Sequence, residues 1–413
     1  MPIAAIILTI VFLIIVFTLQ KSKSLRVYFF SLPLFSVSIL PGVTLPLMMS
    51  IAIMIRLSYG FVGKYTIKNN AVTYLILLLL IWICISFILG GFYDGALVFS
   101  DPSADFKDYT LSENKISPIN FIKFIFISIL AFVSYMASTH IFDRSFSYFF
   151  YGVVFTIIIS IPVVLLNDLT LSNSIFSLFV YGYDQFSFEA RTIERQIFDF
   201  FRLSTLTGEP SFTANILIAV LYFISVKKSS LHLTKFISAG AFILVSLFLT
   251  QSFYAYATFV VLPFLFLSKF ITIPMMVSVI YLFNSIDFSI YGSLGVRIDD
   301  ISFAIEQAAT YPLGLGFLSH RSTSAFFSLL VGIGIPGATL LIIIIFKITK
   351  NINSTFLQNL YLYYILSSLL VIPTTLLFMP WFWLVFFSPL TLINNHEKFV
   401  IKKSASISNS YQA

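Results

Sequence analysis

The residues best suited to chemistry are arginines in two long polar segments, 167–211 and 287–324. These segments contain Arg191, Arg195, Arg202, Arg297 and Arg321 but no lysine, although lysine is twice as common as arginine in the whole chain. The planar guanidinium group binds phosphate through two parallel hydrogen bonds and stays protonated. The choice of arginine therefore indicates a site for a diphosphate group.

Ion pairing is the alternative role for these arginines, because acids accompany them in both segments: Glu189, Glu194, Asp199, Asp299 and Glu306. In residues 189–203 the apolar side chains recur with helical spacing, which predicts an amphipathic helix. Arg191 and Arg195 share another face of that helix, so we interpret them as structural and only secondarily as substrate contacts. Arg202, Arg297 and Arg321 lie near the ends of their segments, and we expect them to bind the diphosphate.

Glu209 and His320 are the candidates for acid–base chemistry. Glu209 stands between a glycine and Pro210, where a helix is expected to begin, and a helix start also offers free N–H groups to an anion. His320 lies in Gly-Phe-Leu-Ser-His-Arg, and a neutral imidazole there could accept a proton from a hydroxyl group. A solvated loop histidine is the plainer interpretation of the same residue.

The elements around these residues are predicted to be membrane helices. The chain has 413 residues, of which 59% are hydrophobic and 10% charged, whereas a soluble domain carries roughly 25% charged residues. We predict an all-α fold, a single polytopic transmembrane domain over 1–413 with about thirteen spans (twelve to fourteen). The spans are placed at 3–20, 26–41, 43–59, 71–91, 118–139, 146–166, 212–226, 234–250, 252–268, 271–286, 325–346, 356–372 and 374–393.

The positions of the basic residues predict the orientation. With Lys21 placed in the cytoplasm, alternate counting puts 16 of the 24 Lys and Arg residues on that side, with only Asp143 and Glu397 of the 17 acids. The N-terminus is then outside and the tail 395–413 is cytoplasmic. The two segments 167–211 and 287–324, and the acidic segment 92–117, face outward. The net charge of +7 is thus explained without a nucleic-acid partner.

Several other kinds of site are not indicated. One outward histidine with scattered acids does not make a metal site, and no cofactor motif occurs in the sequence. No ionisable residue falls near the middle of an expected span, which counts against an ion-coupled transporter. In the second long segment, Asp299 or Asp300 is expected to cap a short helix that runs to Ala309.

Two parts of the sequence resemble the bacterial O-antigen ligase and polymerase superfamily, and most closely the Wzy-type O-antigen polymerases. The first is Arg202 through Ala214, which contains Gly-Glu-Pro-Ser at a helix start. The second contains Gly-Val-Arg at 295–297, Tyr-Pro-Leu-Gly-Leu-Gly at 311–316, His320 and Gly-Ile-Gly-Ile-Pro-Gly at 332–337. The sequence departs from many relatives at Leu249–Tyr254, where Gln251 and Ser252 stand without the arginine found there in the family.

The resemblance implies an all-helical, lipid-donor (GT-C-like) glycosyltransferase of the bacterial inner membrane that uses no cofactor, nucleotide sugar or metal. The charge pattern adds a periplasmic N-terminus. It would transfer a growing glycan from undecaprenyl diphosphate to the next lipid-linked repeat unit on the periplasmic face. Arg202, Arg297 and Arg321 would hold the diphosphate as leaving group. His320 would activate the acceptor hydroxyl, with Glu209 as second candidate. The expected partners are the undecaprenyl-diphosphate-linked oligosaccharide, membrane lipid, a chain-length regulator and the repeat-unit flippase.

Several alternatives remain open at this point, among them another envelope glycan transferase and a purely structural membrane subunit. An O-antigen ligase, which joins finished polysaccharide to the lipid A core, would share the outer arginines and the histidine. A lipid-linked oligosaccharide flippase or other transporter would be expected to show charges inside its helices and short loops, and the sequence shows the reverse.

Overall fold

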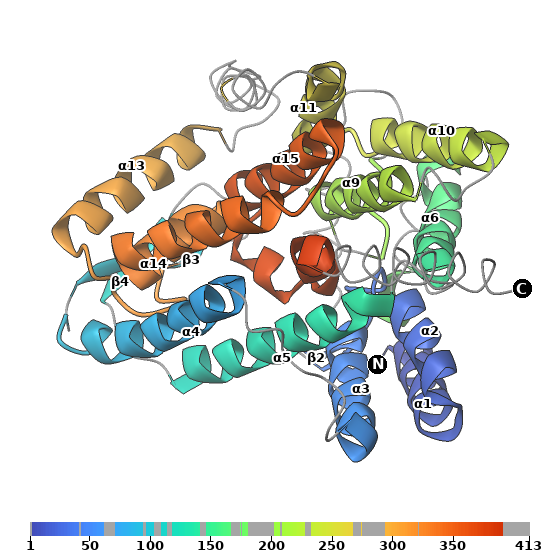
Figure 1. Cartoon of the computed structure of the whole chain (residues 1–413), viewed down its shortest axis with the longest axis horizontal. Coiled ribbons are helices and arrows are strands. Elements are labelled where there is room, and N and C mark those ends of the chain that lie inside the picture. Colours follow the sequence, from blue (N-terminus) through green and yellow to red (C-terminus); the bar gives the residue numbers. More distant parts are fainter. Residues whose placement is uncertain are drawn as a thin grey trace, which may run out of the picture.

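The structure, a computed structural model, describes a chain that is mainly helical (Figure 1). The described residues are 2–40, 43–61, 71–93, 96–102, 109–113, 118–140, 146–166, 174, 176–180, 202–206, 209–227, 233–266, 274, 294–320 and 322–390. The longer helices are α1 (Ile3–Thr18), α2 (Lys21–Ser31), α3 (Leu45–Phe61), α4 (Ala71–Gly90), α5 (Pro118–His140), α6 (Phe146–Leu166), α9 (Pro210–Val226), α10 (Leu233–Leu249), α11 (Phe253–Val261), α13 (Leu294–Thr310), α14 (Ala325–Thr349) and α15 (Thr355–Val371).

Shorter elements complete the described part of the chain. There are two 3-10 helices. The first, η3 (Leu262–Phe266), continues α11, and the second, η4 (Thr374–Phe378), precedes the last described helix, Pro380–Leu390. Two antiparallel hairpins are present, β1 (Ser38–Leu40) with β2 (Val43–Thr44) and β3 (Leu97–Pro102) with β4 (Tyr109–Glu113). The prediction of a helical fold is confirmed, and the hairpins are local additions to it.

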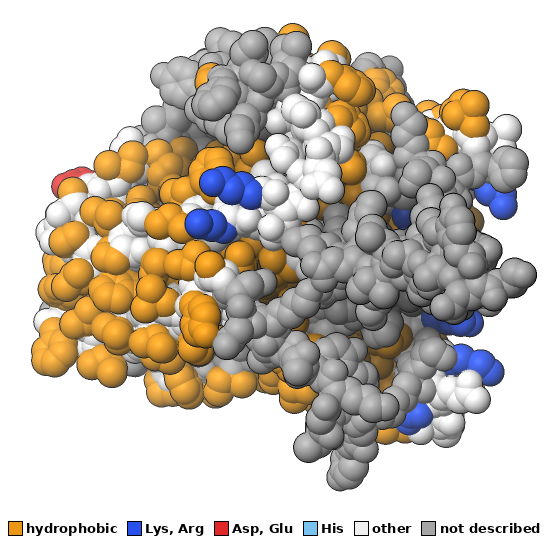
Figure 2. All heavy atoms as spheres, viewed as in Figure 1, with side chains coloured by type: hydrophobic (Ala, Val, Ile, Leu, Met, Phe, Trp, Pro, Cys, Tyr) orange, Lys and Arg blue, Asp and Glu red, His pale blue; other side chains and the backbone are white. Residues whose placement is uncertain are grey.

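Membrane character is visible on the surface of the helices. Three described helices are long and apolar enough to cross a membrane, Ala71–Gly90, Pro118–Ser138 and Ala325–Thr349, and other apolar helices are shorter. Figure 2 shows hydrophobic side chains over the broad face formed by α4, α5 and α14. Many large apolar side chains are exposed there, among them Ile88 on α4 and Ile119 on α5. Such a surface is favourable against lipid and unfavourable against water.

Some of the predicted spans differ from the structure. The predicted helix 26–41 is wrong, because α2 begins at Lys21 and ends at Ser31, after which the chain turns and enters the β1–β2 hairpin. The last span, predicted at 374–393, is divided into η4 and the helix Pro380–Leu390, since Pro380 has no N–H to continue a helical hydrogen-bond ladder. The predicted span 271–286, apart from one residue, and the tail 395–413 lie outside the described residues.

One end of the bundle is held by basic residues. Arg56 near the end of α3 donates to the carbonyl oxygen of Phe17 at 2.6 Å. Nζ of Lys227, just after α9, lies 5.4 Å from the ring centre of Phe146 in α6. Cζ of Arg26 lies 5.5 Å from the ring centre of Tyr148, in the same part of α6. These contacts join α3 to the last turn of α1, and they join the end of α9 and the middle of α2 to the first turn of α6. All three basic residues are ones that the charge pattern assigns to the cytoplasm.

Candidate functional site

The structure describes three of the predicted site residues in full. Arg202, Glu209 and His320 are described with their side chains, whereas Arg297 is described only as part of the first turn of α13. Arg321, Arg191 and Arg195 lie outside the described residues, as does the predicted amphipathic helix except for its last two residues, 202 and 203, which are not helical. The site is therefore built from two segments, 202–213 and 294–328.

Residues 202–206 form a segment without helix or strand, the arm, which begins at Arg202 and is held by hydrogen bonds to the segments on both sides of it. Its guanidinium Nε donates to the carbonyl oxygen of Thr250 at 3.4 Å, and the side chain is 8% exposed. The next residue, Leu203, donates its N–H to the carbonyl oxygen of Leu249 at 2.9 Å, at the end of α10. Leu206 accepts a 2.7 Å hydrogen bond from the N–H of Ser36. The arm is thus held by backbone contacts on both sides, which fixes the position from which Arg202 projects.

Glu209 lies immediately before α9, with Pro210 in the first turn as the sequence predicted. Its side chain does not cap the helix; instead its Oε2 accepts a 3.3 Å hydrogen bond from the hydroxyl of Ser211. Thr213 joins this helix start to the arm, because its hydroxyl donates to the carbonyl oxygen of Glu209 and accepts from the N–H of Thr205, both at 3.1 Å. Arg202 and Glu209 therefore belong to one ordered unit.

His320 is not a solvated loop residue. Its side chain is fully buried, and its imidazole is stacked on the ring of Phe303 with 5.7 Å between centres and 26° between planes. Its carbonyl oxygen accepts a hydrogen bond from the hydroxyl of Ser328 in α14. The interpretation of His320 as an ordinary exposed histidine is therefore wrong.

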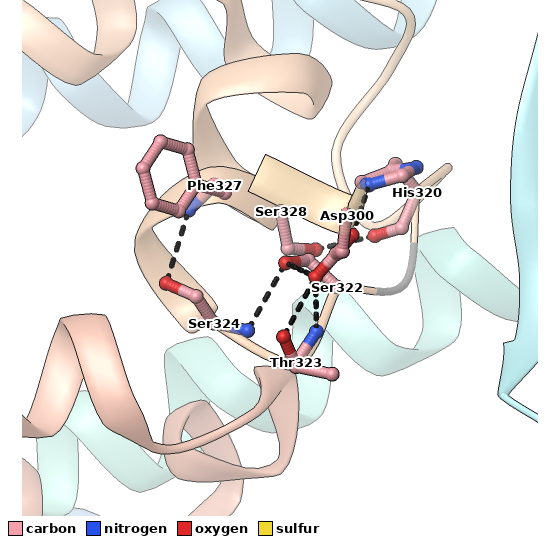
Figure 3. Close-up of polar contacts among 7 residues, drawn as sticks. All are labelled: Asp300, His320, Ser322, Thr323, Ser324, Phe327 and Ser328. Atoms are coloured by element: carbon pink, nitrogen blue, oxygen red, sulfur yellow. Dashed lines mark hydrogen bonds and ion pairs between the residues drawn. The ribbon is translucent and has the colours of Figure 1, made fainter. Parts of the chain in front are cut away.

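The partner of His320 is Asp300, which the sequence analysis did not single out as a site residue. Its Oδ1 lies 3.4 Å from Nε2 of His320, and its Oδ2 accepts from the hydroxyl of Ser322 (2.6 Å) and from the N–H (2.8 Å) and hydroxyl (2.7 Å) of Thr323. Figure 3 shows the carboxylate between the histidine on one side and the start of α14 on the other. Both side chains of the pair are inaccessible to water.

Asp300 is held in its charged form. Burial raises the pKa of its carboxyl, but the hydrogen bonds from His320, Ser322 and Thr323 together outweigh burial and leave the pKa below its ordinary value. A charge buried in this way is stable only when it is fully hydrogen-bonded or paired. The carboxylate is therefore able to stabilise positive charge on the adjacent imidazole.

The prediction that Asp299 or Asp300 caps a short helix is wrong, because α13 begins at Leu294. Asp300 lies in the middle of this 17-residue helix and shares a buried face with Ala304 and Ala308, at i, i+4 and i+8. The small side chains let α13 approach α14, beside which it lies in Figure 1. That spacing, an acid in line with two alanines, is the sequence signal that would have identified Asp300.

The two segments meet at one end of the bundle through α15. Ala325 donates its N–H to the carbonyl oxygen of Ile372 at 2.8 Å, so the start of α14 lies beside the end of α15. One turn earlier in α15, the hydroxyl of Ser368 accepts a 2.6 Å hydrogen bond from Nδ2 of Asn215, in the second turn of α9. Arg202, Glu209 and the Asp300–His320 pair thus lie at the end opposite to Lys227.

Asn215 is the centre of a buried polar network just below this end. Its Oδ1 accepts from the indole Nε1 of Trp381 (2.8 Å) and the hydroxyl of Tyr364 (3.2 Å), and its Nδ2 donates to Ser368 and, at 3.4 Å, to Tyr254. One amide side chain therefore joins α9, α11, α15 and the last helix. A polar network in an apolar bundle fixes the relative positions of its helices when each group has a partner.

Backbone strain is found beside both segments. Among the described residues, only Gln251 (φ 44°) and Leu318 (φ 62°) are non-glycine residues with positive φ. Gln251 lies in the turn that accepts the hydrogen bond from Arg202, at the position where the family resemblance is broken, and Leu318 lies two residues before His320. Such conformations cost of order 1–3 kcal/mol and are found preferentially at functional sites.

Comparisons with known protein-family models, with curated proteins and with solved structures find no match to this chain. Among the described residues, no group of three or more His, Cys, Asp and Glu side chains is arranged to hold a metal ion. The site is characterised by its own geometry: a buried carboxylate–imidazole pair, an anchored arginine and a carboxylate at a helix start, all at one end of a helical bundle.

Proposed function

We propose that the chain is a polysaccharide polymerase of the bacterial inner membrane, a metal-independent glycosyltransferase similar to the Wzy-type O-antigen polymerases. It transfers a growing glycan from undecaprenyl diphosphate to the next lipid-linked repeat unit at the periplasmic face. The observation that carries the proposal is the buried pair of Asp300 and His320 at the same end of the bundle as Arg202.

The proposed chemistry follows from the charges in the site. His320 accepts the proton of the acceptor hydroxyl while the hydroxyl oxygen forms the new glycosidic bond. The bond between the donor sugar and the diphosphate breaks, and the electron pair leaves with the diphosphate. Arg202, Arg297 and Arg321 stabilise the charge that develops on this leaving group. Asp300 stabilises the imidazolium that forms.

The arrangement of basic residues supports the proposed orientation. Arg26, Arg56 and Lys227 lie together at one end of the bundle, and the candidate site lies at the other end of α9. Under the positive-inside rule the basic end is cytoplasmic, which directs the site to the periplasm. Labelling of single cysteines in intact cells with an impermeant reagent should reach position 305 and not position 230, and the reverse result would contradict this topology.

Deletion of the gene tests the proposed function directly. A polymerase mutant should place one repeat unit on the lipopolysaccharide core, visible as a single band in place of a ladder on a gel. A core without any repeat unit would indicate a ligase or a flippase, and an unchanged ladder would exclude all three. Complementation with His320→Ala should restore polymer slowly, since loss of a general base costs about 10²–10⁴-fold in rate. A normal rate for this variant would direct the search for the base to Glu209.

A further inference from the structure

Helix α13 buries only a narrow stripe of its surface. Asp300, Ala304 and Ala308 are buried, whereas Ile305 is 54% exposed and Glu306 is exposed as well. Ala304 belongs to a small buried apolar cluster that is separate from the main core of the bundle. Two alanine methyl groups bury little apolar area, so apolar packing contributes little to holding this helix in place.

The carboxylate of Asp300 is the strong attachment of α13 to α14. Its Oδ2 accepts hydrogen bonds from the hydroxyl of Ser322 at 2.6 Å and from the N–H and hydroxyl of Thr323 at 2.8 and 2.7 Å. All three donors lie in the turn that leads into α14 (Figure 3). Hydrogen bonds to a charged group are roughly twice as strong as those between neutral groups. Asp300 therefore fastens the first half of α13 to the start of α14.

The other end of α13 is attached through the backbone. The helix ends where the N–H of Tyr311 donates to the carbonyl oxygen of Gln307 at 2.8 Å. Directly after it, the carbonyl oxygen of Pro312 accepts a 2.9 Å hydrogen bond from the N–H of Ile335 in α14. A Cβ on Gly314 would meet backbone atoms of α14, so the chain that follows the helix is packed closely on α14. This end of α13 is thus fixed without the help of Asp300.

The same helix covers His320. Phe303 stacks on the imidazole with 5.7 Å between ring centres, and Oδ1 of Asp300 lies 3.4 Å from Nε2. Phe303 and Asp300 are one turn apart on α13, and the side chain of His320 has no exposed surface. A substrate hydroxyl therefore cannot touch the imidazole while α13 stays in this position.

From this arrangement we infer that α13 is a lid over His320, and that Asp300 is the latch that holds the lid shut. The lid opens when Oδ2 leaves its three donors and the helix turns about its fixed end at residues 311 and 312. Arg297, in the first turn of the same helix, moves with the lid. The need for opening during glycan transfer rests on the proposed function, whereas the latch follows from the contacts of the protein alone.

Cysteine labelling measures the opening of the lid. In a Cys84→Ser background, Ala304→Cys places a thiol on the buried face of α13, and the full-length protein in lipid nanodiscs is treated with a water-soluble maleimide. A buried thiol reacts only while the structure around it is open, so the labelling rate reports the open population. Thr323→Val and Ser322→Ala each remove one hydrogen bond to the carboxylate. We expect each variant to raise the rate roughly tenfold or more.

Two controls separate the latch from a general loosening of the protein. Thr310→Val is the same change on α13 itself, at a hydroxyl that bonds to the carbonyl oxygen of Glu306, and it should leave the rate unchanged. Ala219→Cys, fully buried in α9, should react slowly with and without Thr323→Val. Fast labelling of position 304 in the parent, an unchanged rate in the latch variants, or equal acceleration at position 219 would overturn the inference. If one latch variant does not fold, the other decides.

Locking the lid tests its part in the reaction. Ala304 of α13 and Val331 of α14 belong to the same buried cluster, so cysteines at the two positions can be joined by a short bis-methanethiosulfonate and released by reduction. We expect the joined protein to transfer extracted lipid-linked repeat units at least tenfold more slowly, and reduction to restore the rate. The two single-cysteine variants, treated in the same way, are the controls.

The outcomes separate the inference from the proposed function. A joined protein that transfers at the rate of the reduced protein would overturn the lid. A wild-type protein without transferase activity contradicts the proposed function and leaves the labelling result intact.

Discussion

The indole Nε1 of Trp82 in α4 donates a 2.7 Å hydrogen bond to the carbonyl oxygen of Ile333 in α14. That carbonyl group is available because α14 is broken at the next residue, Gly334, whose φ and ψ are 68° and −178°. The loop before His320 lies against the same break: Leu315 donates to Val331 and Gly316 donates to Gly332, both at 2.9 Å. The broken turn of α14 thus serves as a platform for the loop that carries the histidine.

Substitution of Gly334 should therefore be severe. A Cβ at this position would meet backbone atoms of Leu313 and Pro312, and the positive φ disfavours any L side chain. Gly334→Ala is expected to lower the yield of folded protein in the membrane and to abolish polymer formation. Gly240→Ala is the control, because a Cβ at Gly240 in α10 meets nothing within 4 Å. Folded yield measured by fluorescence-detected size exclusion should distinguish the two variants, and equal yields would contradict the role of the break.

Arg202→Lys should keep the charge and lose the activity. Lysine has no group equivalent to the Nε that bonds to Thr250, and it cannot bind a diphosphate through a planar fork. We expect the lipopolysaccharide ladder to collapse while the protein remains in the membrane, and the same result for Arg297→Lys. Arg191→Lys should give a normal ladder, since we interpret that arginine as structural. Normal ladders from all three variants would show that these arginines do not bind phosphate.

Asp300 should contribute to stability in a defined pH range. Its pKa is lowered in the folded protein, so the unfolded chain binds the proton more readily. The stabilisation is then complete above the unfolded value of 3.8 and is lost as the pH falls through the lower folded value. The difference in melting temperature between wild type and Asp300→Asn should shrink as the pH falls below about 4. A difference that grows in acid would mean that the pKa is raised.

Asn215→Leu should destabilise the bundle more than its change in volume explains. The substitution leaves the indole N–H of Trp381 and the hydroxyl of Tyr364 buried without their acceptor, at about 1–3 kcal/mol for each group. Thermal unfolding in detergent should show a clear loss of stability. Tyr364→Phe removes one member of the network together with its hydrogen bond and should cost less. A Leu variant as stable as the wild type would contradict the structural role of the network.

Much of the fold could be predicted from the sequence, because long apolar runs and basic residues are strong signals. Helices α4, α5, α14 and α15 lie close to where the hydropathy places them. The predicted helix 26–41 failed for a physical reason: Leu32, Leu34 and Val37 are buried where the chain turns and enters a hairpin, and apolar composition alone does not distinguish such a segment from a helix.

The candidate site was predictable in its residue types and not in its contacts. His320 and Glu209 could be selected from their neighbours in the sequence, and the structure describes both at the same end of the bundle. The burial of His320 and its pairing with Asp300 depend on how α13 packs on α14, which is a tertiary contact between residues twenty positions apart. A helix start placed at Asp299 or Asp300 concealed this pairing, because a capping residue would project along the helix axis and not toward the neighbouring helix.

In the proposed topology, the unequal lengths of the helices have a consequence for the surrounding lipid. Helix α10, with many exposed apolar side chains, has 17 residues, whereas α14 has 25. At about 1.5 Å per residue, α10 is shorter than a hydrocarbon core of roughly 30 Å. A helix this short is accommodated by thinner lipid, by snorkelling of its flanking residues or by oligomerisation, whereas α14 is long enough for lipid of full depth. Under the proposed function, a polyprenyl carrier that approaches along α10 through thinned lipid meets a headgroup plane lowered toward the arm that carries Arg202.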